Sequence, residues 1–414
     1  MRILLSTFGS RGDVEPMAGL AAQLRAQGAD PVVCAPPDPE FAALLDRAGA
    51  PLAPAFTAVR QWVADALANQ PPMPLPERAA LVMRAQYGAI SAAAEGCDAV
   101  LAAGLFPSMA AARCVAEVRG VPYVGANYCP IFLPSTHHRP HPWPGFPAPA
   151  EETDNRVLWA RDVEARKAVF GAAFSALRSS IGLPPVDDLR DHVLTRRPWL
   201  ASDPILSPWE PTDLCHVVQT GAWILPDTRP LPADLETFLN AGEPPVYVGF
   251  GSMPLPALKD AARAAIAAVR AQGRRVLLAH GWADLDLGDD GEDGFAVGDV
   301  NQQALFPRVA CVVHHGGAGT TTTATRAGAP QVVVPQIADQ PYFAGRVAAL
   351  GVGVAHDGPT PTVESLSAAL GIALTPETRG RSAAVAGMIR ADGAAVAAKL
   401  LIDTVGRGGL SGSA

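Results

Sequence analysis

The sequence predicts an α/β protein made of two doubly wound, parallel-sheet halves. Apolar runs typical of buried strands alternate with helices of ten or more residues, first in one half of the chain and then in the other. A proline-rich stretch over 198–232 separates the two alternating sets and is the best candidate for the connection between them. The length of 414 residues is sufficient for two or three domains.

The first half contains four expected strands, which are 2–7, 31–35, 99–103 and 123–126. Between them we expect helices at 14–27, 41–47 and 108–119, each ended by a glycine. Two stretches rich in proline or aromatic residues, 68–76 and 130–149, interrupt this alternation. Long loops inside a compact domain are usually either functional lids or disordered segments, and of these two we favour ligand-covering loops for both stretches.

The second half repeats the pattern. Strands are expected at 246–250, 275–279, 311–315 and 331–334. Helices are expected to end at Ala271, near Gly328 and at Leu350, with amphipathic helices continuing to about 406 and a frayed end beyond them.

Composition limits the classes of function. The net charge is 32 − 40 = −8, without a basic block, which argues against nucleic acid or an anionic membrane as a partner. The six cysteines are scattered without a C-x-x-C pair, as expected of buried free thiols in a reducing cytosol. Neither a signal peptide nor a run of about 18 apolar residues is present, so we expect a cytoplasmic protein. No group of His, Asp and Glu has the spacing of metal ligands.

The most informative stretch is 311–320, CVVHHGGAGT, in which a buried strand enters a glycine-rich turn and then a helix. Such a turn presents main-chain N–H groups and the positive end of the helix dipole to an anion. Residues Gly316, Gly317, Ala318 and Gly319 let a phosphate approach the main chain, His315 can donate a further hydrogen bond, and Thr320 to Thr323 add hydroxyls. The spacing fits neither the dinucleotide-binding nor the P-loop motif. The alternative is a tight turn in an α/β core with satisfied histidines.

Other polar residues also follow the carboxyl ends of expected strands, where open α/β sheets bind their ligands. These residues are Ser10, Asp13, Ser252, Trp282 and Asp339. Two such edges facing each other imply a ligand in a cleft. Asp13 fits equally well as a helix N-cap and as a general base directed across that cleft.

Two segments of the second half are suited to a nucleotide sugar. Trp282 packs in the core or presents its face to a base, and the segment 298–306 offers amide and main-chain hydrogen bonds to the same base. Asp339 and Gln340 form a carboxylate–amide pair that suits vicinal sugar hydroxyls, although Asp339 can equally cap the helix before Pro341.

Three motifs, G-S-R-G-D-x-E-P at 9–16, H-H-G-G-A-G-T at 314–320 and A-D-Q-P-Y at 338–342, resemble those of family-one, GT-B fold glycosyltransferases. More narrowly, the chain resembles the bacterial enzymes that glycosylate vancomycin- and teicoplanin-type antibiotics. Shorter blocks at 93–97, 181–186, 219–226 and 247–252 support this narrower resemblance, which runs from Met1 to about Val405 and is weakest at 54–90 and 130–170.

The resemblance implies four segments. They are an acceptor-binding domain (1–205), a linker (206–222), a nucleotide-sugar-binding domain (223–395), and a C-terminal helix and tail (396–414) that packs back toward the first domain. It also implies that Asp13 and Asp339 are catalytic, Asp13 as the base and Asp339 through contact with the donor sugar. Donor contacts are expected from Ser10, Arg11, Ser252, Trp282, Val300, Gln303, His315, Gly316, Gly317, Ala318, Gly319, Thr320 and Gln340. Acceptor contacts are expected from Phe8, Tyr128, Phe132 and Trp143.

The implied reaction is an inverting, metal-independent transfer from a UDP- or dTDP-sugar to a hydroxyl of a peptide or other aromatic natural product. The nucleotide sugar is a co-substrate, no cofactor is expected, and the enzyme is expected to be a monomer or weak dimer. Aspartate has a pKa nearer to that of a phenol than to that of an aliphatic alcohol, which favours a phenolic acceptor. The alternatives are a sugar-nucleotide epimerase of similar fold and a non-catalytic nucleotide-sugar binding protein.

Overall fold

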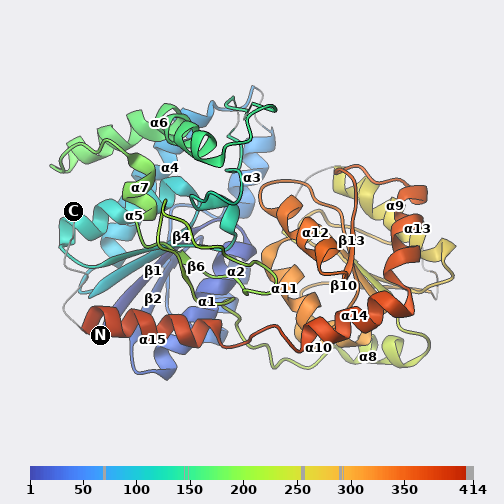
Figure 1. Cartoon of the computed structure of the whole chain (residues 1–414). Coiled ribbons are helices and arrows are strands. Elements are labelled where there is room, and N and C mark those ends of the chain that lie inside the picture. The colour runs from blue at the N-terminus through green and yellow to red at the C-terminus, as the bar shows by residue number, and fades with distance from the viewer. Residues whose placement is uncertain are drawn as a thin grey trace. The chain divides into compact units, whose positions relative to one another are not determined.

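A computed structural model describes residues 1–68, 71–143, 145–147, 149–252, 257–288, 291 and 293–406 (Figure 1). Parts of four expected segments lie outside these residues: positions in the two loops (69, 70, 144 and 148), the start of the helix ending at Ala271 (253–256), the acidic segment (289, 290 and 292) and the tail (407–414). The backbone forms two compact units. Unit 1 contains 1–203, 208–225 and the chain from 390 onward, and unit 2 contains 204–207 and 226–389.

Unit 1 is built on a seven-stranded parallel sheet in the order β3-β2-β1-β4-β5-β6-β7. The strands are β1 (Arg2–Phe8), β2 (Asp30–Ala35), β3 (Leu52–Pro54), β4 (Ala99–Gly104), β5 (Tyr123–Asn127), β6 (Trp199–Leu200) and β7 (Val218–Gln219). Its helices are α1 (Arg11–Ala26), α2 (Pro39–Ala48), α3 (Val59–Ala68), α4 (Leu75–Ala93), α5 (Phe106–Arg119), α6 (Asn155–Ser180), α7 (Leu189–Leu194) and α15 (Gly393–Gly406), with a 3-10 turn η1 at Pro130–Phe132.

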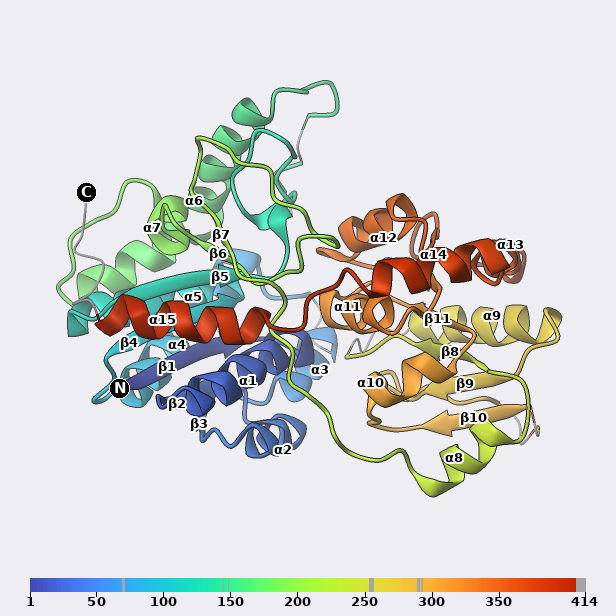
Figure 2. The ribbon, with the colours of Figure 1, turned by 60° about the horizontal axis from the view of Figure 1, so that its bottom comes forward.

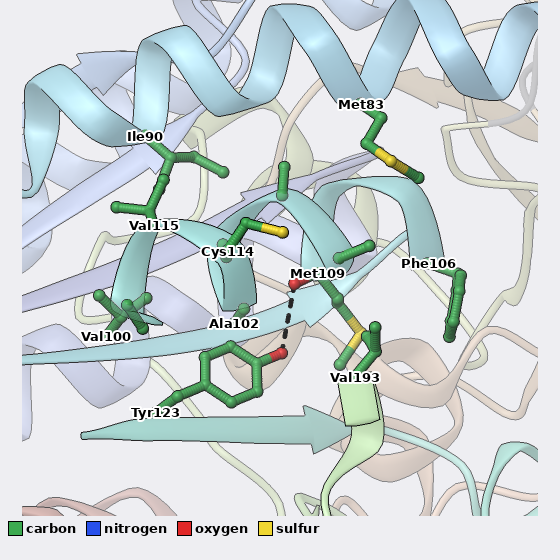
Figure 3. Packing of buried hydrophobic residues seen from close by; sticks show 14 of the residues in the cluster. Met83, Ile90, Val100, Ala102, Phe106, Met109, Cys114, Val115, Tyr123 and Val193 are labelled. Atoms are coloured by element: carbon green, nitrogen blue, oxygen red, sulfur yellow. Dashed lines mark hydrogen bonds between the residues drawn. The ribbon is translucent and has the colours of Figure 1, made fainter. Parts of the chain in front are cut away.

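The two faces of the first sheet are covered by different helices. On one face, Leu4 and Phe8 of β1 join a core with α4, α5, α6 and α7. Figure 3 shows part of this core, where Met83 and Ile90 of α4 pack toward α5. On the other face α1 packs against both α2 and α15, and α15 runs alongside α1 (Figure 2). The last helix in the described part of the chain therefore belongs to the same unit as the first strand.

Unit 2 is a six-stranded parallel sheet in the order β10-β9-β8-β11-β12-β13. The strands are β8 (Val246–Gly249), β9 (Val276–Ala279), β10 (Gly294–Val297), β11 (Cys311–His314), β12 (Gln331–Val333) and β13 (Gly353–Ala355). The helices are α8 (Ala233–Asn240), α9 (Ala257–Ala271), α10 (Gln302–Leu305), α11 (Ala318–Arg326), α12 (Gln340–Ala349), α13 (Val363–Ala373) and α14 (Pro376–Ala386), with a 3-10 turn η2 at Phe306–Arg308.

The prediction of two doubly wound parallel sheets is confirmed. Three local expectations were wrong. The loop expected over 68–76 ends earlier, because α4 begins at Leu75 with Pro76 in its first turn, a position that needs no N–H donor. The stretch 198–232 is not entirely loop, since β6 and β7 within it extend the first sheet. β11 ends at His314, so His315 already belongs to the turn. Among the described residues, no helix is long and apolar enough to cross a membrane.

The contact of α15 with the segment before unit 2 leaves no room for a side chain at Gly393. A Cβ atom there would overlap the main chain of Gly221 and Ala222. We predict that Gly393→Ala lowers the free energy of unfolding by about 1–3 kcal/mol, because either α15 or the facing segment must shift. The control is Gly88→Ala in α4, where the added methyl meets nothing within 4 Å and should stabilise by about 0.5–1 kcal/mol. Equal midpoints of thermal unfolding for the two variants would contradict this packing.

Candidate functional site

Asp13 lies in the first turn of α1, where the main chain fixes its carboxylate. Ser10 is the N-cap, and Asp13 is the third helical residue. The main-chain N–H of Ser10 donates to Oδ2 of Asp13 at 2.9 Å. The structure therefore does not support the N-cap interpretation of Asp13. Its side chain instead closes a capping box, an arrangement that satisfies an otherwise unpaired N–H at a helix start.

Two glycines make room for this carboxylate. A Cβ atom at Gly9 would overlap Oδ2 of Asp13, and one at Gly104 would lie 3.2 Å from Oδ1. Gly104 ends β4 with φ +95°, a conformation that side-chain-bearing residues rarely adopt. The Asp13 carboxylate thus lies against the carboxyl ends of β4, the central strand of the sheet, and of its neighbour β1. Sequence analysis missed Gly104, although a glycine directly after the apolar run 99–103 was a usable signal.

Two predicted site residues contact this turn or lie in it. Arg11 donates from Nε to Glu15 Oε2 at 2.8 Å, so its guanidinium is drawn toward α1 itself. Tyr128, the residue after β5, donates from its hydroxyl to the main-chain carbonyl of Asp13 at 3.2 Å. The structure thus brings Ser10, Arg11, Asp13 and Tyr128 together at one edge of unit 1.

In unit 2 the turn after β11 is organised by His314. The Gly316 N–H donates to Nδ1 of His314 at 3.1 Å, so the ring must carry its proton on Nε2, which lies 3.0 Å from Oε1 of Gln331. Gln331 then donates to Thr325 at 3.0 Å, and the Thr325 hydroxyl donates to the Thr321 carbonyl. Complete burial lowers the pKa of His314 to about 3. His314 is therefore a neutral structural residue that holds the turn.

His315 is placed differently. Its ring lies against Gly317, the N-cap of α11, and against Gly251 in the turn after β8. Burial lowers its pKa to about 4, so the imidazole is neutral near pH 7. Within the described part of the chain, Nδ1 is buried and has no hydrogen-bond partner. A neutral imidazole beside the N-terminus of α11 can donate to an anion together with the first helical N–H groups, which have no intrahelical acceptor.

The glycine-rich turn itself is tightly constrained. Gly316 has φ +91°, and a Cβ there would lie 2.7 Å from Cγ1 of Val333. The expectation that the hydroxyls of Thr321 and Thr322 donate to an anion was wrong. Both hydroxyls donate to carbonyls one turn back in α11, at 2.9 and 2.7 Å, and both residues are buried. Thr320 remains half-buried at the helix start, next to Ala318 and Gly319.

The predicted sugar-binding pair follows β12, in the segment 335–340. Ala338 has φ +55°, and Asp339 occupies the N-cap position of α12 without a side-chain capping bond. The structure therefore does not support the capping interpretation of Asp339. Burial raises the pKa of this carboxyl to about 6. Gln340 is buried, and its Oε1 accepts from the N–H groups of Gln336 and Ile337 at 2.8 and 3.1 Å, so its amide shapes the loop that carries Asp339.

The residues expected near the nucleotide base lie on the turns beside this edge. Ser252 follows β8, and the Trp282 N–H donates to the Gly251 carbonyl at 3.1 Å, which joins the turns after β8 and β9. Trp282 and Val300 are 8% and 7% exposed, so both are largely packed into unit 2. Gln303 accepts from the Asp227 N–H at 3.4 Å.

One organising residue in this region was missed. Asn301 is buried and donates from Nδ2 to the carbonyls of Asp227 and Arg229 at 3.0 and 2.7 Å. Its Oδ1 accepts from the Ala304 N–H and so caps α10. The amide that sequence analysis offered to a base is therefore committed to holding the chain around 227–229.

The aromatic residues predicted to contact an acceptor have different surroundings. Phe8 is fully buried, and its ring centroid lies 5.9 Å from that of Phe56, so it belongs to the core of unit 1. Phe132 lies edge-on to His141 at 5.4 Å. Trp143 donates from Nε1 to Asp162 of α6 at 2.8 Å.

Trp143 is part of a charged cluster that the sequence did not reveal. Asp162 is paired at 2.8 Å with Arg166, and both side chains are almost completely buried. The Arg166 guanidinium lies over the rings of Trp143 and Phe106. This cluster ties the loop around Trp143 to α6. A cavity of about 230 Å³ lies at this loop, lined by Pro140, His141, Pro142, Trp143, Phe146, Pro147, Leu158, Arg161, Asp162, Glu164 and Ala165.

In the described ranges, no three His, Cys, Asp or Glu side chains are grouped so as to hold a metal ion.

Comparison with solved structures identifies the class of fold. The structure of the glycotransferase of kitacinnamycin covers 97% of this chain at a TM-score of 0.69 and 23% identity, with 98% of its own chain matched. That of the calicheamicin glycosyltransferase CalG4 covers 98% of this chain and 98% of its own at a TM-score of 0.67 and 18% identity. Both support the GT-B fold of glycosyltransferases.

Comparison with known sequences is more specific. Residues 293–397 match the family model described as Erythromycin biosynthesis protein CIII-like, C-terminal domain. Two relatives from Amycolatopsis orientalis, glycosyltransferase GtfE and vancomycin aglycone glucosyltransferase, are 55% and 53% identical, each over 98% of this chain and 98% of its own. A third, dTDP-epi-vancosaminyltransferase from the same organism, is 50% identical over 98% of both chains. The chain belongs to the family of vancomycin-type glycopeptide glycosyltransferases, and the resemblance noted in its motifs is confirmed.

The burial of His314 makes stability depend on pH. Its pKa of about 3 in the folded protein lies below the usual value near 6.5 for an unfolded chain. The stabilising contribution is therefore complete above pH 6.5 and is lost as the pH falls from 6.5 toward 3, at about 1.4 kcal/mol per pH unit. We predict that His314→Asn flattens the decline in unfolding free energy between pH 6.5 and 5, measured by urea titration. His216→Asn, at an exposed position, should keep the wild-type slope, and an unchanged slope in His314→Asn would contradict the assignment.

Proposed function

We propose that the protein transfers a hexose or deoxyhexose from a UDP- or dTDP-sugar to a hydroxyl of a glycopeptide-type antibiotic aglycone. The observation that carries the proposal is the fixed carboxylate of Asp13 at the edge of the unit 1 sheet, held by the Ser10 N–H and accommodated by Gly9 and Gly104. The names of two relatives support the substrate classes, one being an aglycone glucosyltransferase and the other a dTDP-sugar-dependent transferase.

In this proposal Asp13 is the general base. The acceptor hydroxyl attacks the anomeric carbon and loses its proton to the Asp13 carboxylate while the bond to the nucleoside diphosphate breaks. A single displacement of this kind inverts the anomeric configuration. An aspartate with a pKa near 4 lies about 6 units below a phenol and further below an aliphatic alcohol, which favours a phenolic hydroxyl as acceptor.

We propose that the donor binds to unit 2. The proposed segments are an acceptor-binding domain at 1–205, a linker at 206–222, a nucleotide-sugar-binding domain at 223–395, and a C-terminal helix and tail at 396–414. The diphosphate is received by His315, by the main-chain N–H groups of 317–320 and by Ser252. These neutral donors stabilise the charge that grows on the leaving group without reorganising, and on that basis we propose transfer without a metal ion. Asp339, ionised near neutral pH because its pKa is about 6, accepts hydrogen bonds from the sugar hydroxyls, and Gln340 holds the loop that carries it.

The remaining roles follow from position. Trp282, Val300 and Gln303 are assigned to the base on unit 2, where Trp282 and Val300 are only 8% and 7% exposed. Arg11 adds positive charge at the start of α1. Phe132 and Trp143 lie on the loop assigned to the acceptor, with Trp143 anchoring that loop to α6 through Asp162. The enzyme is proposed to act in the cytoplasm, as a monomer or weak dimer.

Product formation tests the proposal directly. The purified protein is incubated with EDTA, with UDP-glucose, UDP-N-acetylglucosamine or a dTDP-deoxysugar, and with a glycopeptide aglycone or its monoglucosylated form. Intact-mass measurement should show addition of one sugar with at least one pair, at a rate that EDTA leaves unchanged. Addition only when Mg²⁺ is supplied would refute metal independence. Binding of nucleoside diphosphate without any product would place the acceptor outside the glycopeptides.

A further inference from the structure

Tyr128 contacts the helix turn that carries Asp13 through its phenolic hydroxyl. It follows β5 directly, is half-buried, and donates its phenolic hydrogen to the main-chain carbonyl of Asp13 at 3.2 Å. Burial, with a smaller contribution from the Asp13 charge, raises the pKa of the phenol well above its usual value, so the hydroxyl remains a donor. A side chain committed in this way has its polar group directed at the protein rather than at an acceptor molecule.

The turn that Tyr128 contacts lacks one hydrogen bond of a regular helix. Pro16 lies inside α1, where it lacks the N–H that would bond to the carbonyl of Gly12 and its ring crowds that carbonyl. Gly12 adds further freedom, since a glycine lowers the helical preference of its position. The first turn of α1 is therefore held by the capping box and by the bonds from the Asp13 and Val14 N–H groups to the Ser10 carbonyl, and the contact from Tyr128 adds to these.

The ring of Tyr128 also contacts Trp223. Trp223 meets it edge-on, with ring centroids 6.1 Å apart and an interplanar angle of 85°. Trp223 is buried and donates from Nε1 to the Thr220 hydroxyl at 2.9 Å. The same segment packs against α1, because a Cβ atom at Gly19 would lie 2.9 Å from the main chain of Ile224 and Leu225. The segment 220–225 therefore packs against both Tyr128 and α1.

We propose that Tyr128 is a positioning residue for transfer, whose hydroxyl fixes the first turn of α1 and thereby the direction of the Asp13 carboxylate. The inference rests on the proposed function, since it assigns no chemistry to Tyr128 itself. It also replaces the acceptor contact expected for this residue. A base displaced by even a fraction of an ångström from the attacking hydroxyl loses much of its effect, because proton transfer requires close and aligned partners.

The chain provides a matched control five residues away. Tyr123 begins β5, is buried, and also donates its hydroxyl to a main-chain carbonyl of a helix, that of Met109 in α5, at 3.4 Å (Figure 3). Tyr123 lies in the core between the sheet and α5. Tyr123→Phe and Tyr128→Phe therefore each remove a hydroxyl that donates to a main-chain carbonyl. The carbonyl that loses its donor lies in α5 for Tyr123→Phe and in α1 for Tyr128→Phe.

The experiment compares both variants in steady-state kinetics and in thermal unfolding. We expect Tyr128→Phe to lower kcat about tenfold or more, with the KM values for donor and acceptor changed less than twofold and a midpoint of unfolding close to that of Tyr123→Phe. We expect Tyr123→Phe to keep the wild-type kcat. A raised acceptor KM with an unchanged kcat would instead make Tyr128 an acceptor contact and overturn the proposal, as would equal kcat values for the two variants.

Two further measurements separate positioning from general structure. In the Asp13→Asn background, which keeps an oxygen for the Ser10 N–H, adding Tyr128→Phe should change the single-turnover rate less than twofold, because the base is already absent. An additive tenfold loss would contradict the proposal. Amide hydrogen exchange over 10–15 needs no substrate and should be faster in Tyr128→Phe than in Tyr123→Phe. If the wild-type enzyme is inactive but exchange is faster in Tyr128→Phe, the proposed function is refuted and the inference stands. If exchange is equal in the two variants, the inference is refuted and the proposed function stands.

Discussion

The hydrogen bond from the Ser10 N–H to Oδ2 of Asp13 is the interaction on which the account of unit 1 depends. It occurs where β1 gives way to α1, and it requires a chain that can bring a carboxylate against two strand ends. Gly9 and Gly104 provide that space. The helix that follows is then fixed by α15 on one side and by Tyr128 at its first turn. A surface aspartate would need none of these supports.

Unit 2 uses the same edge of a parallel sheet in a different way. Two adjacent histidines divide the work of one turn: His314 is buried and bonded to Gly316 and Gln331, while His315 has a buried Nδ1 without a partner in the described chain. The first fixes the geometry of the turn. The second leaves a neutral donor beside the start of α11. In the proposed reaction, such a site would bind the diphosphate without a full positive charge that would also hold the product tightly.

Sequence reasoning succeeded where a local pattern determines structure. β1, β11 and the helices that end at Gly49 and Gly120 were predicted, because buried runs and left-handed glycines have local signatures. It missed α6, whose inward face includes the paired charges of Asp162 and Arg166, so hydrophobic periodicity could not reveal it. Two-residue strands such as β6 and β7 are defined by their neighbours in the sheet rather than by their own residues.

The candidate site shows the same division. Asp13 and the turn at 314–320 were found because glycines and polar residues follow apolar runs. The fate of each side chain was not predictable, since it depends on tertiary partners. The hydroxyls of Thr321 and Thr322 return to their own helix, the Gln340 amide closes its own loop, and the indole of Trp143 is bonded to a buried aspartate. Residue type indicates whether a group can donate or accept a hydrogen bond, whereas the tertiary structure determines its partner.

The most direct test of the account is to remove the base while keeping its hydrogen bond. Asp13→Asn retains an oxygen for the Ser10 N–H and the volume of the side chain, so the capping box should survive. The account predicts that single-turnover transfer falls by about a hundredfold or more, while the Kd for the nucleoside diphosphate stays within about twofold of wild type. Turnover at the wild-type rate in a correctly folded variant would contradict the assignment of Asp13 as the catalytic base.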